Sequence, residues 1–309
     1  MAIYLVLARR RLRHLMEECN TGNPEALERR RKLTNVHLGV TGAAANVQEM
    51  DYGLFRRKVM QAAGIDLGCY KENQIKRRLA AALTRSGHAS LFDYWRAMEQ
   101  DPGLLRDFVD FVTINVSSFF RNREKFDELA GSILPGLLKA RRSLKVWSAG
   151  CSTGQEPYTI AMILSELTPG TRHQIIGTDI NTSALRLARE AVYARDDVKE
   201  VRPELVQKYF MVEGDKLRLR DPVRQMVEFR PHNLLADHYE QDCDIILCRN
   251  VMIYFTEEAK ARVFRGFHAS LRPGGVLFIG GTETIMAASE LGFELISPFF
   301  YRRRDPVVA

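Results

Sequence analysis

Apolar positions along the chain follow one period in the N-terminal third and another in the rest. Between residues 51 and 121 apolar side chains recur three or four residues apart, as at Phe55, Val59 and Met60. This spacing is typical of helices that bury one face, and glycines and a Pro-Gly pair separate the helical runs. The pattern predicts a small all-helical domain, and we assign residues 50–122 to this domain and its linker.

Residues 123–309 alternate short apolar runs with stretches of helical spacing. The expected strands are 144–149, 174–179, 226–230, 243–249 and 275–280. Strands that alternate with helices predict a parallel sheet with helices on both faces, the doubly wound α/β class. Ser297-Pro298 separates two apolar runs that predict an antiparallel hairpin at the end of the domain, and a small β insertion with a turn and an edge strand is expected at about 198–225.

The run LKVWSAGCSTGQEPY at residues 144–158 predicts a buried strand, a glycine turn and a helix start. Gly150 and Gly154 lack a Cβ atom, so the backbone of the turn can approach a ligand closely. The turn is not the G-x-G-x-x-G of dinucleotide sites, and no lysine follows it as in phosphate-binding loops. Its spacing resembles the D-x-G-x-G-x-G loop of S-adenosylmethionine-dependent methyltransferases, with Ser148 at the acidic position and Ser152 at the middle glycine. By itself, the run also fits an ordinary strand, turn and helix.

A second apolar strand ends in a carboxylate, Asp179, about 25 residues after the glycine turn. In doubly wound folds an acidic side chain at this position accepts hydrogen bonds from ribose hydroxyls. A carboxylate at a strand end can also serve only as a cap for the next helix, for which Asn181 and Thr182 are further candidates. The distance from the glycine turn favours the ribose interpretation.

Composition excludes several classes of protein. The chain has 309 residues, of which 46% are hydrophobic and 27% charged, as is usual for a soluble globular protein. No apolar run approaches the roughly 20 residues that a membrane span needs. The five cysteines are scattered, with no C-x-x-C pair and no histidine at zinc-ligand spacing. These features indicate a reduced, cytoplasmic protein without a metal site.

The net charge of +7 and the pI near 9.2 come largely from the first 48 residues, which hold eight Lys and Arg against four Glu. Because the remainder is only mildly basic, a solvated surface explains its charge better than a nucleic-acid interface. The apolar run from Ile3 to Ala8 precedes the basic residues, which reverses the order of a secretory signal. We expect residues 1–49 to be a disordered extension, since Met50 stands immediately before the first amphipathic helix.

Two segments leave alternatives open. The expected helix at 71–85 is basic, and this charge fits either a solvated face or a docking surface for an acidic partner. Its basic residues are Lys71, Lys76, Arg77, Arg78 and Arg85. The segment 111–121 is rich in β-branched and small polar residues and ends in two phenylalanines and an arginine. On its composition alone, this segment fits plain packing between two domains.

Four motifs, taken in order, point to one family. They are T-x-N-x-[ST]-x-F-F-R at 113–121, SAGCSTGQEPY at 148–158, FRPHNLL at 229–235 and CRNVMIYF at 248–255. Together they resemble the chemotaxis-receptor glutamate methyltransferase family, the CheR type, over residues 50 to about 303. The resemblance implies an S-adenosylmethionine-dependent methyltransferase sheet with a small N-terminal all-helical domain and a small β insertion.

The resemblance also implies an activity. It is the transfer of the methyl group of S-adenosyl-L-methionine to glutamate side chains of methyl-accepting receptors, giving glutamyl methyl esters and S-adenosyl-L-homocysteine. The cofactor-binding residues implied by the motifs are Asn115, Ser117 and Arg121 at the methionine end, Glu156 at the amino group, Asp179 at the ribose, Asn233 and Leu234 at the adenine, and Arg249 and Asn250 at the end of the fourth strand. Ser117 stands where many members have threonine, and it keeps the hydroxyl.

The chemistry of ester formation fits this set of residues. A glutamate with a pKa of about 4.3 is ionised at neutral pH, so the nucleophile needs no general base. The rate then depends on alignment and on removal of water from the carboxylate. We therefore expect Arg121 to orient the incoming carboxylate and the Tyr254 hydroxyl to position the same oxygen or the methyl group. The alternative for Tyr254 is a buried aromatic ring with a satisfied hydroxyl.

The expected partner is the acidic helical cytoplasmic domain of methyl-accepting receptors, and the protein is expected to act as a monomer without nucleic acid or membrane insertion. Family members that tether to a receptor's C-terminal pentapeptide have a longer glycine-containing loop in the β insertion. The corresponding segment here, 211–216, is short, which does not favour tethering. The helix at 71–85 also has Ala80, Ala81 and Ala82 where better-known members are richer in arginine.

Two other functions remain as alternatives, a nucleic-acid methyltransferase and a signalling scaffold that binds cofactor without turnover. Base-amino methylation uses a [DN]-P-P-[YFW] loop after the fourth strand, whereas this chain has Cys248-Arg249-Asn250-Val251 there. A scaffold would be expected to have a degraded site, yet Glu156 and the glycine turn are present. The sequence leaves open which receptor and which glutamates are modified.

Overall fold

The structure is a computed structural model that describes residues 49–113 and 117–304. Its first part is a helical unit, as the spacing of apolar residues predicts. The unit comprises α3 (Glu49–Ala63), the short η2 (Leu67–Cys69), α4 (Glu72–Ser86), α5 (Leu91–Gln100) and α6 (Pro102–Val112). Its core contains Phe55, Trp95 and Phe108, with edge-to-face contacts between their rings. The predicted extension lies outside the described residues except for Glu49, which begins α3.

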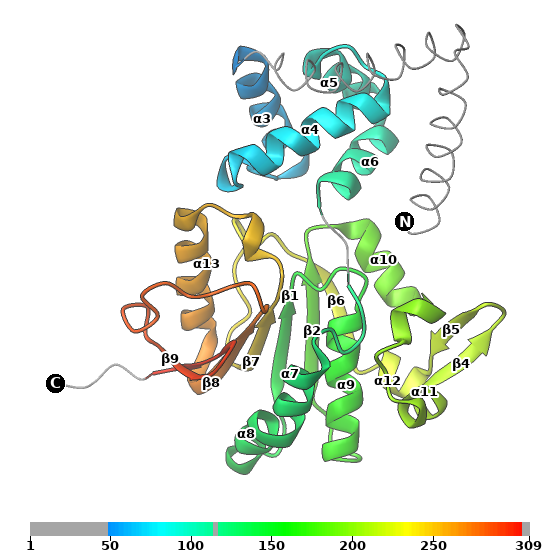
Figure 1. Cartoon of the computed structure of the whole chain (residues 1–309), viewed down its shortest axis with the longest axis vertical. Helices are drawn as coiled ribbons and strands as arrows, with labels where there is room; N and C mark the ends of the chain where they lie inside the picture. The colour runs from blue at the N-terminus through cyan, green and yellow to red at the C-terminus, as the bar shows by residue number, and fades with distance from the viewer. Residues whose placement is uncertain (1–48, 114–116, 305–309) are drawn as a thin grey trace, which may run out of the picture.

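The second part is built on a seven-stranded sheet (Figure 1). In spatial order, the strands are β6 (Val227–Pro231), β2 (Gln174–Asp179), β1 (Lys145–Ala149), β7 (Cys243–Cys248), β8 (Leu271–Ile279), β10 (Phe300–Arg303) and β9 (Phe293–Ser297). The first five run parallel, and β10 is antiparallel to both of its neighbours. The doubly wound methyltransferase sheet predicted from the sequence is confirmed, including the hairpin around Ser297-Pro298.

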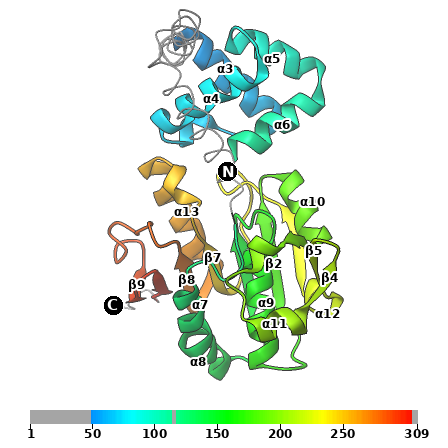
Figure 2. The same ribbon diagram turned by 45° about the vertical axis from the view of Figure 1, so that its right-hand side comes forward.

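Helices cover both faces of this sheet (Figure 2). One face packs against α7 (Arg123–Glu128), η3 (Leu129–Ile133), α8 (Leu134–Ala140) and α9 (Gln155–Leu167). The edge strand β6 and its neighbour β2 also contact α10 (Thr182–Glu190). The other face packs against α13 (Glu257–Ser270), which begins shortly after η5 (Met252–Tyr254). Trp147 of β1 is fully buried on that second face, where its ring meets Phe267 of α13 edge to face.

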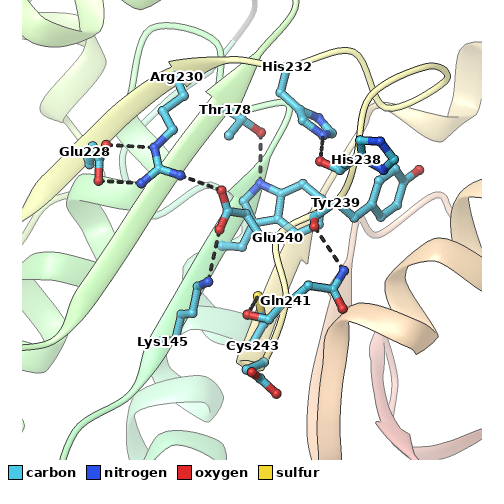
Figure 3. A network of polar contacts seen from close by, with 12 residues as sticks. Lys145, Thr178, Glu228, Arg230, His232, His238, Tyr239, Glu240, Gln241 and Cys243 are labelled. Carbon is cyan, nitrogen blue, oxygen red and sulfur yellow. Dashed lines mark hydrogen bonds and ion pairs between the residues drawn. The ribbon is translucent and has the colours of Figure 1, made fainter.

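The loop between β6 and β7 closes the second face with polar contacts (Figure 3). Glu240 accepts from Lys145 of β1 at 3.0 Å and from Arg230 of β6 at 2.8 Å, which ties the loop across two strands. Trp147 Nε1 donates to Thr178 Oγ1 at 2.9 Å, so its buried N–H group has a partner. His232 lies beside Trp147 at the start of this loop.

The β insertion is larger than the sequence interpretation of residues 198–225. Three antiparallel strands form it, β3 (Val192–Ala194), β5 (Lys216–Leu219) and β4 (Phe210–Glu213), with η4 (Arg195–Val198), α11 (Pro203–Tyr209) and α12 (Asp221–Arg224) between or beside them. The difference arises at β3, a strand of three residues directly after α10, which is too short to show a period-two pattern.

Short contacts join the helical unit to the sheet domain at the carboxyl ends of the parallel strands. Lys71 N donates to Tyr254 O at 2.8 Å and Thr256 N to Cys69 O at 2.9 Å, on either side of an isolated bridge between Tyr70 and Phe255. Further along the junction, Asn181 Nδ2 donates to Thr113 Oγ1 at 2.8 Å. These contacts hold α4 above the ends of the strands, where it forms one wall of a cleft.

Candidate active site

A cleft of about 1150 Å³, counted with its open mouth, lies between the helical unit and the sheet domain. The helical unit contributes Tyr70, Gln74, Ile75, Arg78, Val112 and Thr113 to its walls. The sheet domain contributes the turns that follow β1, β2, β6 and β7, together with residues 117, 118 and 121 of the connecting segment. Loops at the carboxyl ends of parallel strands are the usual ligand site of open α/β sheets.

The glycine turn after β1 forms the floor of the cleft. Gly150 N and Cys151 N both donate to Thr178 O, at 2.8 and 2.9 Å, which fixes the turn to the neighbouring strand. Gly150 has φ of 82°, and a Cβ atom there would lie 2.5 Å from Val251 Cγ2. Ser152 has φ of 51°, and its Oγ is buried without a hydrogen-bond partner among the described residues. The turn therefore requires glycine at 150 for both conformation and space.

Asp179 ends β2 beside this turn, where the sequence predicted a ribose ligand. Its Oδ2 accepts from Ser152 N at 2.7 Å and its Oδ1 from Asn181 N at 2.9 Å. Burial raises the pKa of the carboxyl, and the backbone donors at Asn181 and Ser152 oppose that rise. Each carboxylate oxygen can accept more than one hydrogen bond, so Asp179 can hold the turn and still accept from a ligand hydroxyl.

Glu156 lies in the first turn of α9. Its Oε1 accepts from Ser148 Oγ at 2.7 Å, and its Oε2 lies 3.5 Å from Arg249 Nη1. Burial raises the pKa of this carboxyl, and the positive charge of Arg249 opposes that rise. Ser148, which occupies the acidic position of the methyltransferase loop, thus orients the carboxylate of Glu156 in this chain.

Arg249 contacts two aromatic rings and the backbone of the connecting segment. Its guanidinium lies 5.0 Å from the ring centre of Phe126 and 4.6 Å from that of Phe278. Nη2 donates to Arg121 O at 2.8 Å and to Asn122 Oδ1 at 3.0 Å. Burial lowers the pKa of the guanidinium. Arg249 lines the cleft, and it also fixes the backbone that carries Arg121.

Arg121 and Tyr254, the two predicted catalytic residues, line the same cleft. The Tyr254 side chain is half-buried, and the Arg78 guanidinium lies 5.8 Å from its ring centre. Burial raises the pKa of the Tyr254 phenol, although the charges of Arg78 and Arg121 oppose the rise. The phenol is therefore protonated at neutral pH and can donate a hydrogen bond into the cleft.

Asn233 and Leu234 follow β6 on the far side of the cleft. Asn233 Nδ2 donates to Gly64 O at 2.8 Å and Oδ1 accepts from Leu235 N at 2.9 Å, so its amide ties the loop to the helical unit. Leu234 is 9% exposed and supplies an apolar wall. Asn250 follows β7 with φ of 60°, and its Oδ1 is buried without a partner in the described part of the chain.

The connecting segment 111–121 has some residues that line the cleft and others that pack against the sheet domain. Ser117 and Arg121 line the cleft, whereas Phe119 is fully buried and meets the rings of Tyr193 and Phe210 in the β insertion. Residues 114–116 lie outside the described residues, and with them the predicted cofactor ligand Asn115. The segment thus packs against the sheet domain and also faces the cleft.

Several cleft residues were not singled out as site residues from the sequence. Gln74 lines the cleft, and its Oε1 is buried without a partner among the described residues. The sequence places Arg78 among the basic residues of a solvated or docking face. Its Nη1 donates to Phe111 O at 3.0 Å and Val112 O at 2.6 Å, and it lines the cleft. The available signal was spacing, because Gln74 and Arg78 are four residues apart and thus share one face of α4.

The polar groups of the cleft fit the implied cofactor, a cation that carries a ribose and an adenine. Glu156 and Asp179 provide negative charge near the glycine turn, and Ser152 Oγ and Asn250 Oδ1 are polar atoms that lack a partner within the described protein. No cluster of three or more His, Cys, Asp or Glu that could hold a metal ion occurs among the described residues. No helix in the same residues is long and apolar enough to cross a membrane.

Comparison with known proteins places these observations in a family. A model described as "CheR methyltransferase, SAM binding domain" matches residues 115–298, and one described as "CheR methyltransferase, all-alpha domain" matches residues 50–113. The chemotaxis protein methyltransferase of Listeria monocytogenes is 41% identical over 255 residues, covering 82% of this chain and 97% of the relative. That of Escherichia coli K12 is 37% identical over 239 residues, covering 73% and 81%. That of Vibrio parahaemolyticus is 35% identical over 263 residues, covering 82% and 95%.

Proposed function

The chain belongs to the CheR methyltransferase family, and from this premise we propose how its cleft brings a receptor glutamate to the methyl donor. The protein is an S-adenosylmethionine-dependent methyltransferase of chemoreceptors, and the family assignment gives glutamate as the methylated side chain. One observation carries the proposal. The predicted site residues within the described part of the chain, which come from five separate segments, all line one cleft.

S-adenosyl-L-methionine, when bound, supplies a methyl group that is activated by a positively charged sulfur. Glu156 is proposed to accept a hydrogen bond from the cofactor's amino group, and Asp179 to accept from its ribose. Asn233 and Leu234 are proposed to border the adenine, and Ser117 and Arg121 to line the methionine end. Arg249 and Asn250 are proposed to lie beside the cofactor at the end of β7. The assignment of Asn115 to the methionine end of the cofactor stays a prediction, since this residue lies outside the described residues. These assignments are supported by the placement of the described residues around the cleft and by the polar atoms that lack a protein partner.

The receptor carboxylate reacts without a general base, because a glutamate with a pKa of about 4.3 is already ionised. Its oxygen forms a bond to the methyl carbon while the bond from that carbon to sulfur breaks, and the sulfur becomes neutral. Arg121 orients the carboxylate through its planar guanidinium, and the protonated Tyr254 hydroxyl donates to the same oxygen. Arg249 supports this arrangement because it holds the carbonyl of Arg121.

The rival functions have weaker support. A nucleic-acid methyltransferase would need a base-reading loop after β7, whereas Asn250 and Met252 there donate their backbone N–H groups to Glu283. A scaffold without turnover is disfavoured because Glu156, Asp179 and Arg121 all line an open cleft.

The finer partner assignments are also proposals. We propose that the acidic helical domain of the receptor approaches from the side of α4, that the enzyme acts as a monomer in the cytoplasm, and that it does not tether to a C-terminal pentapeptide. The short β4–β5 hairpin supports the last point, since its turn consists of only Gly214 and Asp215.

Arg121 provides a direct test of the proposed chemistry. Loss of a hydrogen bond to a charged group costs roughly 1.5–3 kcal/mol, so Arg121→Ala should lower kcat by about 10- to 100-fold. Arg121→Lys should lower it less, because lysine keeps the charge and loses the two-pronged geometry. Turnover should be measured with receptor at saturating cofactor, beside calorimetric binding of S-adenosylhomocysteine.

The matched control for this test is Arg123→Ala. Arg123 lies outside the cleft and pairs with Asp127 at 3.8 Å, so its loss should leave kcat unchanged. The loss of turnover in Arg121→Ala should also exceed its loss of cofactor affinity. If Arg121→Ala turns over normally once cofactor saturates, Arg121 is a cofactor ligand only and the orienting role passes to Tyr254.

A further inference from the structure

The carboxylate of Glu283 lies beneath the turn that follows β7. Its Oε2 accepts the backbone N–H groups of Asn250 at 2.9 Å and Gly280 at 2.7 Å, and its Oε1 accepts that of Met252 at 2.8 Å. The side chain is 6% exposed. One buried carboxylate thus joins two segments that are 33 residues apart in the sequence.

The turn held by Glu283 has an unusual backbone. Asn250 has φ of 60°, a left-handed conformation that residues other than glycine adopt rarely and that persists where surrounding contacts enforce it. β7 ends at Cys248, so the N–H groups of Asn250 and Met252 no longer belong to the strand. Glu283 supplies the acceptors that these buried donors need. A Cβ atom at position 280 would lie 2.7 Å from Asn250 N and from Glu283 Oε2, so the three groups are closely packed.

The same turn sets the relative position of several cleft residues. Asn250 and Tyr254 line the cleft, and Val251 packs against Gly150 of the glycine turn. Glu283 itself does not line the cleft. Any effect of Glu283 on the reaction therefore passes through the backbone of residues 250–254.

We propose that Glu283 is a positioning residue that holds Asn250 and Tyr254 in register with the glycine turn. The inference rests on the proposed function of the cleft and deepens it. A carboxylate suits this task because it only accepts hydrogen bonds, and three N–H groups converge on its two oxygens. Glutamine has the same size, but its NH₂ group would face at least one backbone N–H. Aspartate keeps the charge but is one methylene shorter.

The test compares Glu283→Gln with the wild-type full-length chain in three measurements, namely thermal unfolding, calorimetric binding of S-adenosylhomocysteine, and kcat with receptor at saturating cofactor. Glu283→Gln should weaken binding and lower kcat by at least about tenfold each, the size expected for lost hydrogen bonds to a charged acceptor. Hydrogen exchange should become faster at residues 250–254 and stay slow in β1 and β2. Glu283→Asp should show smaller changes in the same direction, and it serves as the test if Glu283→Gln does not fold.

The matched control is Asp244→Asn. Asp244 is 3% exposed at the opposite end of β7, where it accepts from Lys145 N at 2.7 Å and pairs with Arg141 at 3.1 Å. This variant should be less stable to heat and should keep wild-type binding and turnover per folded molecule. If the folded Glu283 variants also keep both, the positioning role is wrong. If the wild-type chain itself fails to bind S-adenosylhomocysteine, the proposed function fails instead.

Discussion

The carboxylate of Asp179 accepts backbone N–H groups from Ser152 and Asn181 and retains capacity for further hydrogen bonds. Glu156 is similar, since it is held by Ser148 and Arg249 at the edge of the same cleft. Burial raises the pKa of both carboxyls, and the contacts with donors oppose this rise. Contacts within the protein therefore fix these carboxylates before a ligand binds, which reduces the ordering needed for binding.

At this scale we predict that Asp179→Ala weakens cofactor binding. The substitution removes proposed hydrogen bonds to the ribose, each worth roughly 1.5–3 kcal/mol with a charged acceptor. It also releases Ser152 N, so the glycine turn loses one of its supports. Calorimetry with S-adenosylhomocysteine should give an affinity lower by about tenfold or more. Unchanged affinity in a folded variant would remove Asp179 from the site.

The sequence could identify cleft residues that belong to local motifs. Gly150 follows β1 and Asp179 ends β2, and both positions are visible from strand patterns alone. It could not identify Glu283 or the contact of Arg249 with Arg121 O, because these interactions join segments 33 and 128 residues apart. Such pairings depend on how the strands order themselves in space.

Among the elements, α4 departs most from its sequence interpretation. The sequence indicates one basic face on this helix, but the basic side chains lie in different surroundings. Arg78 faces the cleft and donates to carbonyls of α6, and Lys76 pairs with Glu72 at 2.7 Å. Arg77 and Arg85 are exposed and do not line the cleft. A test of receptor docking therefore belongs at Arg77 and Arg85, because a change at Arg78 would also disturb the fold.

We predict that Arg77→Glu combined with Arg85→Glu raises the KM for receptor and leaves the affinity for S-adenosylhomocysteine unchanged. The reason is that opposite charges steer the encounter with an acidic receptor surface, so the wild-type rate at low substrate should also fall with salt. Steady-state kinetics at two ionic strengths would measure both effects.

The control for this prediction carries the same change of charge elsewhere. Arg142 and Arg265 are exposed residues of the sheet domain that do not line the cleft, and their joint replacement by glutamate should leave KM unchanged. If the rate is independent of salt and the Arg77/Arg85 variant has an unchanged KM for receptor, the basic residues of α4 only form a solvated face.

The central parallel strands were predictable because they are short continuous apolar runs. The helices of the N-terminal unit were predictable because their buried residues recur at helical spacing. The five parallel strands and the terminal hairpin lie within one or two residues of their expected limits, except that β8 begins earlier, at Leu271. The short elements were not predictable, since β3 and η5 have three residues each and carry no period. These short elements nevertheless complete the β insertion and carry Tyr254.

On the scale of the whole molecule, the cleft exists only because the two units meet. Tyr70, Gln74 and Arg78 come from the helical unit, whereas Glu156, Asp179 and Asn250 come from the sheet domain. The limits of the predicted domains, 50–122 and 123–309, stay predictions. The alternation of helical and strand patterns indicated two units, but no local pattern could show that α4 closes the cofactor cleft.

We predict that residues 1–49 are dispensable. A chain that begins at Met50 should fold and methylate receptor within about twofold of the full-length rate, because the family match begins at residue 50. Thermal unfolding and turnover of the two chains should be compared side by side. Loss of soluble folding or of activity in the shorter chain would contradict the assignment of these residues to an extension.

The proposed receptor methylation is tested most directly by an assay of methyl transfer from tritiated S-adenosylmethionine. Receptor-containing membranes and RNA are offered together in this assay. The proposed activity predicts label on a membrane receptor protein that mild base releases as methanol, as expected of a glutamyl methyl ester. Arg121→Ala should give much less of this label at saturating cofactor. Label on RNA, or no transfer by the folded wild-type chain, would show that the protein does not methylate receptor glutamates as proposed.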